Sequence, residues 1–163
     1  MTVPKLIADL SEFCESKTAH FSLPVPVQKN DTEELFIPPN VFKQRLPSIN
    51  DYEKHSPFIL VQYLKGGQSQ KEGQRPQATA EIRITVCIYN RDNEEEGSLA
   101  LLNVVSAIRQ GLLTQVVIGE QFKLDVEAGM EDEIYPDNTA PYFIGDIYCK
   151  FLLPPIEREV YFG

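Results

Sequence analysis

The sequence contains no tryptophan and few residues of the kinds that build reactive sites. Its three cysteines, Cys14, Cys87 and Cys149, are scattered and odd in number, and no Cys-x-x-Cys pair occurs. A disulfide framework and a cysteine-based zinc site are therefore not expected, and a reduced, cytosolic setting fits this cysteine usage best. The lack of tryptophan also disfavours a sugar-stacking cleft, although tyrosine can stack on sugars as well.

Catalytic and cofactor-binding motifs are missing too. The two histidines, His20 and His55, stand in no metal-ligand spacing such as HExxH, and they are interpreted as loop or surface residues. No GxSxG or SxxK sequence surrounds a nucleophile. Gly66 and Gly67 form the one glycine pair, without the pattern of a phosphate-binding loop. We therefore predict no catalytic, cofactor-binding or metal-binding residues, and a protein that is not an enzyme.

The chain also lacks a basic cluster that could bind nucleic acid. It has 15 basic and 24 acidic residues, a net charge of −9, and residues 120–137 alone hold seven acids against Lys123. Such a surface repels phosphates. The acidic runs 92–96 and 131–133 have no EF-hand spacing, so solvated loops are favoured over a cation site. A glycosidase-like pair of distant acids stays open as an alternative.

No apolar run is long enough to cross a membrane, and no basic stretch followed by an apolar one suggests a secretory signal. A chain of 163 residues favours one domain over residues 1–163. A domain of this size buries about 70% of the surface that its unfolded chain exposes. A hydrophobic core without metal or disulfide support is therefore expected.

Two helices are predicted from the spacing of apolar residues. Residues 2–17 place Leu6, Leu10 and Cys14 on one face, and Thr2 is the expected N-cap. Residues 97–113 carry a broad apolar stripe, with Ser98 as the expected N-cap. The acids 94–96 precede that start, where the helix dipole favours negative charge.

Four strands are predicted, at residues 58–64, 80–89, 122–127 and 142–152. In 80–89, isoleucine and valine alternate with Glu81, Arg83, Thr85 and Cys87, which indicates one buried and one wetter face. In 122–127, the inward side chains are expected to be Phe122, Leu124 and Val126. The strand 142–152 is apolar on both faces and is expected to be central. Cys87 should lie opposite Ile84, and Cys149 should share the face of Ile147.

The segments between these elements are predicted to be irregular. They are the proline-rich segment 21–57, the polar loop 66–77, interpreted as mobile, an acidic loop before Pro141, and a tail at 154–163. The expected fold is α+β: a mainly antiparallel four-stranded sheet, two helices packed on one face, and a long irregular N-terminal connection.

The chain resembles the tail-terminator and tail-completion (head–tail joining) proteins of long-tailed bacteriophages. The resemblance is carried by four segments: IPPNVFKQRLP (37–47), SPFILVQYLKG (56–66), ATAEIRITVCIYNRDNEEEGSLALLNVVSAIRQGLL (78–113) and PYFIGDIYCKFLLPPIER (141–158). It implies an α+β subunit of a homo-oligomeric ring, usually a hexamer, that caps the tail tube and joins it to the head. It implies no cofactor, and DNA would pass through without sequence-specific binding. The protein would belong to the virion and assemble in the bacterial cytoplasm.

Two hypotheses follow from this resemblance. Segments 66–77 and 21–57 contact neighbouring subunits or the tail tube, because they are long and irregular. The acidic surface either lines the DNA channel or faces outward and aids solubility. Three alternatives stay open: another head–tail connector, a small cytosolic enzyme built from scattered carboxylates, and a module that binds a peptide along a strand edge.

Overall fold

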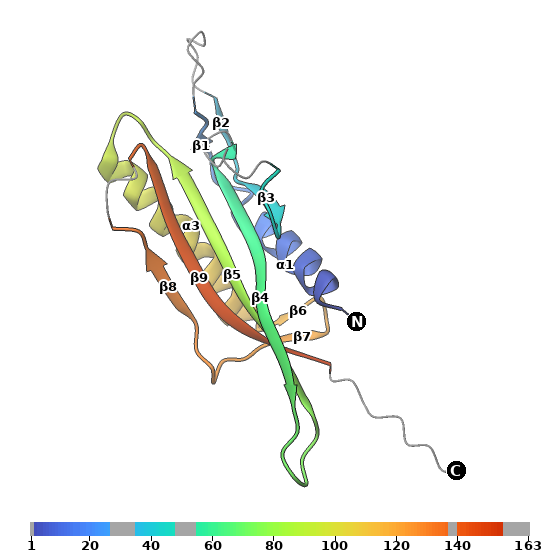
Figure 1. The fold of residues 1–163 in the computed structure, drawn as a ribbon. Coiled ribbons are helices and arrows are strands. Elements are labelled where there is room, and N and C mark those ends of the chain that lie inside the picture. Colours follow the sequence, from blue (N-terminus) through green and yellow to red (C-terminus); the bar gives the residue numbers. More distant parts are fainter. Residues whose placement is uncertain (1, 27–34, 48–54, 137–139, 155–163) are drawn as a thin grey trace.

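A seven-stranded mixed sheet with two helices against it forms the body of the protein (Figure 1). The computed structural model describes residues 2–26, 35–47, 55–136 and 140–154. Its elements are α1 (Val3–Thr18), β1 (Leu23–Pro24), β2 (Phe36–Ile37), β3 (Asn40–Lys43), β4 (Phe58–Ser69), β5 (Gln77–Tyr89), α3 (Glu94–Gln115), β6 (Val117–Ile118), β7 (Phe122–Leu124), β8 (Glu131–Ile134) and β9 (Tyr142–Leu153).

The strand order in the large sheet is β3-β4-β5-β9-β7-β6, and β8 also pairs with β9. The β3–β4 pair is parallel and the other pairs are antiparallel. Strands β1 and β2 form a separate two-stranded sheet. The prediction of a mainly antiparallel four-stranded sheet was therefore wrong.

The strands that the sequence did not indicate are short. β3 lies within the proline-rich segment, and β8 was expected to be an acidic loop. β9 is 12 residues long, so one of its edges pairs with β7 through Phe151 and Leu152 and with β8 farther along. A long central strand can thus hold short strands that have little tendency to form alone.

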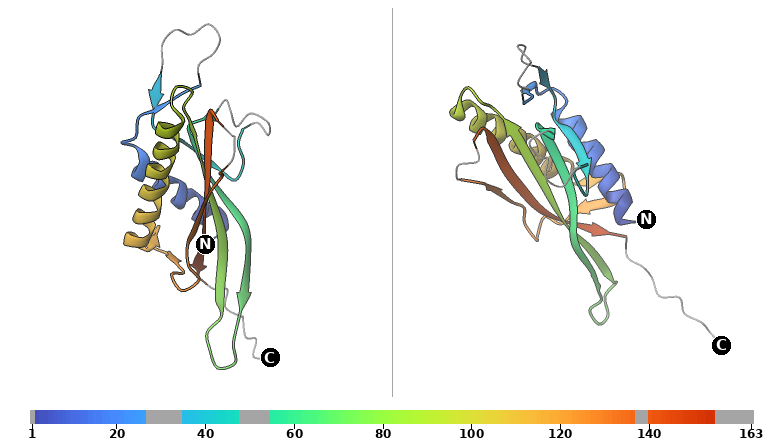
Figure 2. Two further views of the ribbon diagram at one scale, coloured as in Figure 1. Left: turned by 90° about the vertical axis from the view of Figure 1, so that its left-hand side faces the viewer. Right: turned by 45° about the horizontal axis from the view of Figure 1, so that its top comes forward.

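Both helices lie on the same face of the sheet, as Figure 2 shows from the side. α1 packs against β3 and β4, α3 packs against β5 and β9, and the two helices contact each other. The core between them is closely packed: Leu10, Ile84, Val104 and Ile108 are fully buried. Alternation along β5 and the helical spacing of α1 and α3 place these side chains inward.

The N-cap predicted for α1 was correct, and the N-cap predicted for α3 was not. Thr2 caps α1, as predicted, and its side chain accepts the N–H of Lys5. α3 begins at Glu94, and its N-cap is Asn93, whose side chain accepts the N–H of Glu96 at 3.1 Å. The prediction of Ser98 as the cap was wrong, because an asparagine five residues earlier bonds the first turn and adds three acids to it.

Several predicted boundaries also need correction. Residues 66–69 and 77 belong to strands, so only 70–76 connect β4 to β5 and the predicted loop 66–77 was too long. The segment 21–57 contains β1, β2 and β3, although residues 27–34 and 48–54 lie outside the described residues. Val126 follows β7 and is exposed, not inward. Beyond Pro154, the predicted tail 154–163 lies outside the described residues.

In the described residues, no helix combines the length and the apolar character that crossing a membrane requires.

Candidate functional site

The sheet face opposite the two helices, here called the outer face, has an apolar part and a polar part. Phe58, Leu60 and Cys87 form a small buried cluster at one end. Farther along, Arg83 donates from Nε and Nη2 to Oε1 of Gln62, at 3.2 and 2.8 Å. The outer face therefore has charged and amide side chains in the middle of the sheet, where the sheet residues of the other face are almost all hydrocarbon.

Asp146 is the most buried charged residue of the outer face, with 2% of its surface exposed. Its Oδ1 accepts a hydrogen bond from the hydroxyl of Thr85 at 2.6 Å, and its Oδ2 accepts from Tyr135 at 2.9 Å and from Tyr148 at 3.4 Å. Three hydroxyl donors compensate the loss of water around the carboxyl group. The donors come from β5, from β9 and from Tyr135, the residue after β8. The bond between Tyr135 and Asp146 therefore helps hold β8 against β9.

The cluster shifts the pKa of the Tyr135 phenol. Burial raises the pKa of the Tyr135 phenol, and the hydrogen bond to Asp146 raises the pKa further. The residue is nevertheless 45% exposed, while its hydroxyl group bonds to Asp146. The tyrosine thus acts as a neutral donor that holds the end of β8.

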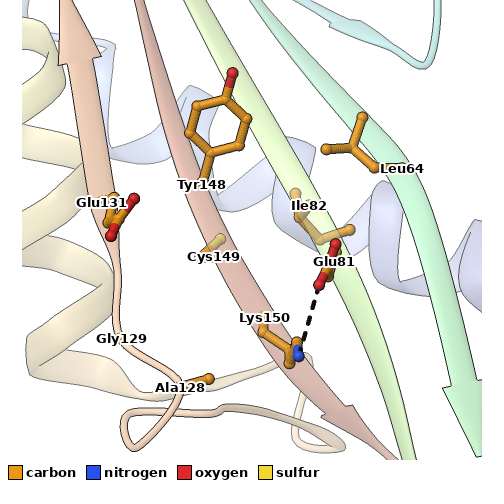
Figure 3. A pocket seen from close by; sticks show the side chains of 9 residues that line it. All are labelled: Leu64, Glu81, Ile82, Ala128, Gly129, Glu131, Tyr148, Cys149 and Lys150. Atoms are coloured by element: carbon orange, nitrogen blue, oxygen red, sulfur yellow. Dashed lines mark ion pairs between the residues drawn. The ribbon is translucent and has the colours of Figure 1, made fainter.

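An open hollow of about 370 Å³ lies on the outer face beside this cluster (Figure 3). Glu81 crosses its floor, with Oε1 3.6 Å from Nζ of Lys150 and Oε2 3.7 Å from Nζ of Lys65. Glu131 and Tyr148 stand at its other side. The hollow is wide, shallow and charged, which suits contact with a polar surface better than enclosure of a small molecule.

The cysteines occupy core positions. Burial raises the pKa of the Cys149 thiol to about 12, and burial together with the neighbouring Cys149 raises the pKa of Cys14 further. Neutral buried thiols are poor nucleophiles. Cys87 lies on the face opposite Ile84 and Cys149 shares the face of Ile147, which confirms both predicted orientations.

The two histidines lie beside aromatic rings. The ring of His20 is 4.2 Å from that of Phe21, and the ring of His55 is 5.4 Å from that of Phe42. Within the described ranges, no three His, Cys, Asp or Glu side chains come together as metal ligands. The expectation that the whole chain has no metal site stays a prediction.

The acidic runs have different positions in the fold. Glu94, Glu95 and Glu96 form the first turn of α3. Residues 131–133 belong to β8, an edge strand. Asp132 forms an ion pair with Arg109 of α3 at 2.6 Å, whereas Glu131 and Glu133 lie exposed beside it. The acidity of this segment is evident from its composition, but its strand was not predicted.

The opposite edge of the sheet is extended by a side chain. Gln44 follows β3 and has a left-handed backbone with φ of 66°. Its amide Nε2 donates to the carbonyl of Tyr63 at 3.1 Å, and its Oε1 accepts the N–H of Tyr63 at 2.9 Å. One side chain therefore makes the bonds that a further residue of β3 would make, and β4 continues beyond it without a partner strand on that side in the described structure.

Residues 64–77 form the end of the β4–β5 hairpin, here called the hairpin arm, which extends away from the body (Figure 1). All of these residues except Pro76 are exposed. The arm carries Lys65, Lys71 and Arg75 against Glu72, so it is basic in a chain whose net charge is −9.

No protein-family model matches this chain, and a search of curated proteins found no match. What the protein does is therefore inferred from its geometry and from the sequence resemblance described above.

Sequence patterns placed most of the outer-face residues on their strands. They did not indicate that Asp146, Thr85 and Tyr135 meet, because this depends on the register between β5, β9 and β8.

Proposed function

We propose that this protein is a structural component of a long-tailed bacteriophage, a tail terminator whose copies form a ring that caps the tail tube and joins it to the head. Its partners are further copies of itself, usually six to a ring in the family that it resembles, the tube protein, and the connector proteins of the head. The ring belongs to the tail or neck of the virion and is assembled in the bacterial cytoplasm.

The hairpin arm is the observation that carries this proposal. Its β4 residues are exposed from Leu64 to Ser69. β9 pairs with β5 only as far as Ala78, so residues 69–77 form a two-stranded ribbon beyond the rest of the sheet. A two-stranded hairpin is marginally stable by itself in water and gains stability when it packs against something else. An arm of this kind is expected in a protein that contacts a neighbouring subunit. In an isolated subunit the arm packs against no other part of the described chain.

The outer face supports the same conclusion. Its polar groups are distributed over β4, β5, β8 and β9, and its hollow is wide and shallow. Side chains on such a surface can meet a broad protein partner. The hydroxyl cluster around Asp146 is closed off, and its bonds to β5 and to the residue after β8 give it a structural role.

DNA would pass through the ring without sequence-specific binding. The described part of residues 120–137 is strongly acidic, and carboxylates repel the phosphate backbone. Whether these acids line the channel or face outward is a separate question. Charge reversal at Glu131, Asp132 and Glu133 answers it through the rate of DNA passage in any rings that the variant still forms.

Removal of the arm tests the proposal. We expect deletion of residues 68–76, closed by an Asn-Gly turn, to leave the thermal unfolding of the body nearly unchanged, because the deleted residues are almost all exposed. In a phage that carries this deletion, heads and tails should accumulate without joining. A variant with residues 70–76 replaced by glycine and serine is the matched control for arm length. Normal yields of infectious particles from the deletion would remove the arm from this account.

Loss of the whole protein separates a terminator from another head–tail connector. A cap that stops growth of the tube should, when missing, leave tubes of excessive length, whereas loss of a different connector leaves tubes of normal length. Electron microscopy of lysates measures this length. Infectious particles with normal tails in the absence of the protein would contradict both functions.

A further inference from the structure

Two short edge strands of the large sheet, β3 and β8, carry charges of opposite sign, while β6 ends the sheet beyond β7. β3 pairs with β4 alone and β8 pairs with β9 alone, as far as the structure describes the chain. Lys43 and Arg45 lie exposed at the β3 edge, and Glu131 and Glu133 lie exposed at the β8 edge. None of these four side chains forms an ion pair with another described residue.

The two edge strands lie at the same level of the sheet. Residue pairing across the strands connects Lys43 at one edge with Asp132 at the other, through a single row: Lys43, Val61, Ile84, Ile147 and Asp132. A neighbouring copy in the same orientation would therefore bring its β8 to the height of β3 without a shift along the strands.

The strand directions suit such a junction. β3 runs parallel to β4, which is antiparallel to β5, and β9 runs opposite to β5 and to β8. β8 is thus antiparallel to β3. If a second copy continues the sheet, its β8 lies antiparallel to β3 of the first copy, the commoner and slightly more stable pairing.

The backbone groups needed for this pairing point outward. The N–H groups of Asn40 and Gln44 bond to Pro57 and Val61 on the β4 side, so alternation directs the N–H of Val41 away from the sheet. On β8, the N–H of Tyr135 bonds to Ile144 of β9, and alternation directs the backbone of Ile134 outward. Each edge therefore has groups to share with a second strand.

Charge on an edge strand ordinarily prevents pairing with other strands. Lys43 lies on the helix-covered face, like Val61. Glu131 and Glu133 lie on the outer face, like Asp146, so these charges act through the net sign of each edge and not as facing ion pairs. By that net sign β8 repels another β8 and β3 repels another β3, but β8 attracts β3. The charges select against a symmetric dimer and in favour of a head-to-tail contact, the kind that closes into a ring.

We propose that the subunits join edge to edge, with the acidic strand β8 of one copy lying antiparallel beside the basic edge of β3 in the next. This rests on the proposed ring and names the surfaces that build it. The Asp146 cluster and the Arg109–Asp132 ion pair then have a clear role, because they hold β8 in position for the neighbouring copy.

Two charge-reversal variants test the junction. One carries Glu131→Lys and Glu133→Lys, which makes both edges basic, and the other carries Lys43→Glu and Arg45→Glu, which makes both edges acidic. Each variant alone should lose ring formation, with the dissociation constant between subunits raised about 100-fold. An equimolar mixture should form rings again, with the two variants alternating, because each basic edge then meets an acidic one.

Native mass spectrometry gives the masses of the rings, and sedimentation velocity gives the affinity, both in solution and with purified tail tubes. A matched control for the Glu131 and Glu133 variant reverses two exposed acids on the outside of α1, Glu12→Lys and Glu15→Lys, which raises the net charge equally and should not affect assembly. Circular dichroism checks that all variants are folded.

The outcomes separate the two proposals. If the wild-type protein forms rings and either edge variant alone does so as well, the edge junction is wrong and the ring proposal stands. Rings that fail in both variants but do not return in the mixture also overturn the junction. If the wild-type protein forms no ring, either in solution or on tail tubes, both proposals fail. Unchanged assembly with slower DNA passage in the Glu131 and Glu133 variant would place these acids in the channel instead.

Discussion

Successive residues of strand β5 point to opposite faces of the sheet, and the two faces have different surroundings. On the helix-covered face, Ile82, Ile84 and Val86 have at most 1% of their surface exposed. On the outer face, Arg83 and Thr85 are half-buried and make hydrogen bonds to β4 and β9. One face thus supplies the hydrophobic stability of the body, and the other supplies polar groups that fix neighbouring strands and can meet a partner.

The largest difference between the faces should appear when a large side chain is removed from the core. Phe151 is fully buried on the helix-covered face of β9. Its replacement by alanine should reduce the free energy of unfolding by about 4 kcal/mol, measured by urea denaturation. The adjacent Leu152, half-buried on the outer face, is the matched control, and Leu152→Ala should cost about 1 kcal/mol. Equal losses would show that the outer face is packed as tightly as the other.

The next largest effect concerns the hydroxyl cluster around Asp146 on the outer face. Asp146→Ala leaves the hydroxyl groups of Thr85 and Tyr135 without their acceptor, which should cost about 2 kcal/mol. Asp146→Asn keeps one carbonyl acceptor and should cost less. Urea denaturation of both variants checks this order, and the prediction fails if the alanine variant is as stable as the wild type.

A smaller effect is expected from the ion pair between α3 and β8. Because both side chains are partly exposed, Arg109→Ala should lower the free energy of unfolding by about 0.5 kcal/mol. The local effect should be clearer: amide hydrogen exchange should become faster at residues 131–134. The adjacent exposed Gln110 provides the control, since Gln110→Ala leaves this pair intact. Unchanged exchange in the Arg109 variant would show that the pair does not hold β8.

The smallest effect is a pH dependence. The Tyr135 pKa is raised in the folded protein, so the neutral phenol is favoured there. Its stabilising contribution is complete below the unfolded pKa of about 10 and is lost as the pH rises through the higher folded value. Tyr135→Phe should therefore give a flatter decline of stability above about pH 10, measured by thermal unfolding. Parallel curves for the two proteins would contradict this role of the hydroxyl group.

The sequence predicted the elements whose signals are local. Thr2 with the apolar spacing of α1 indicated the first helix, and alternation in residues 80–89 indicated β5. These patterns come from a single periodicity and from one capping side chain, so they do not depend on distant contacts.

The elements that depend on a distant partner could not be predicted in this way. β8 reads Glu-Asp-Glu-Ile, with one apolar residue and no alternation, and it is a strand because β9, the Asp146 cluster and Arg109 hold it. β3 lies among prolines and pairs in parallel with β4. The two charged edges, and with them the candidate interface, are therefore visible only in the folded chain.

Hydrogen–deuterium exchange of the protein, free and bound to the ends of purified tail tubes, tests most directly whether it works through its edges and arm. Binding should slow exchange at residues 40–43, 64–77 and 131–134, while the buried part of β5 is equally slow in both states. Protection confined to other surfaces, or no change at these three segments, would contradict the account.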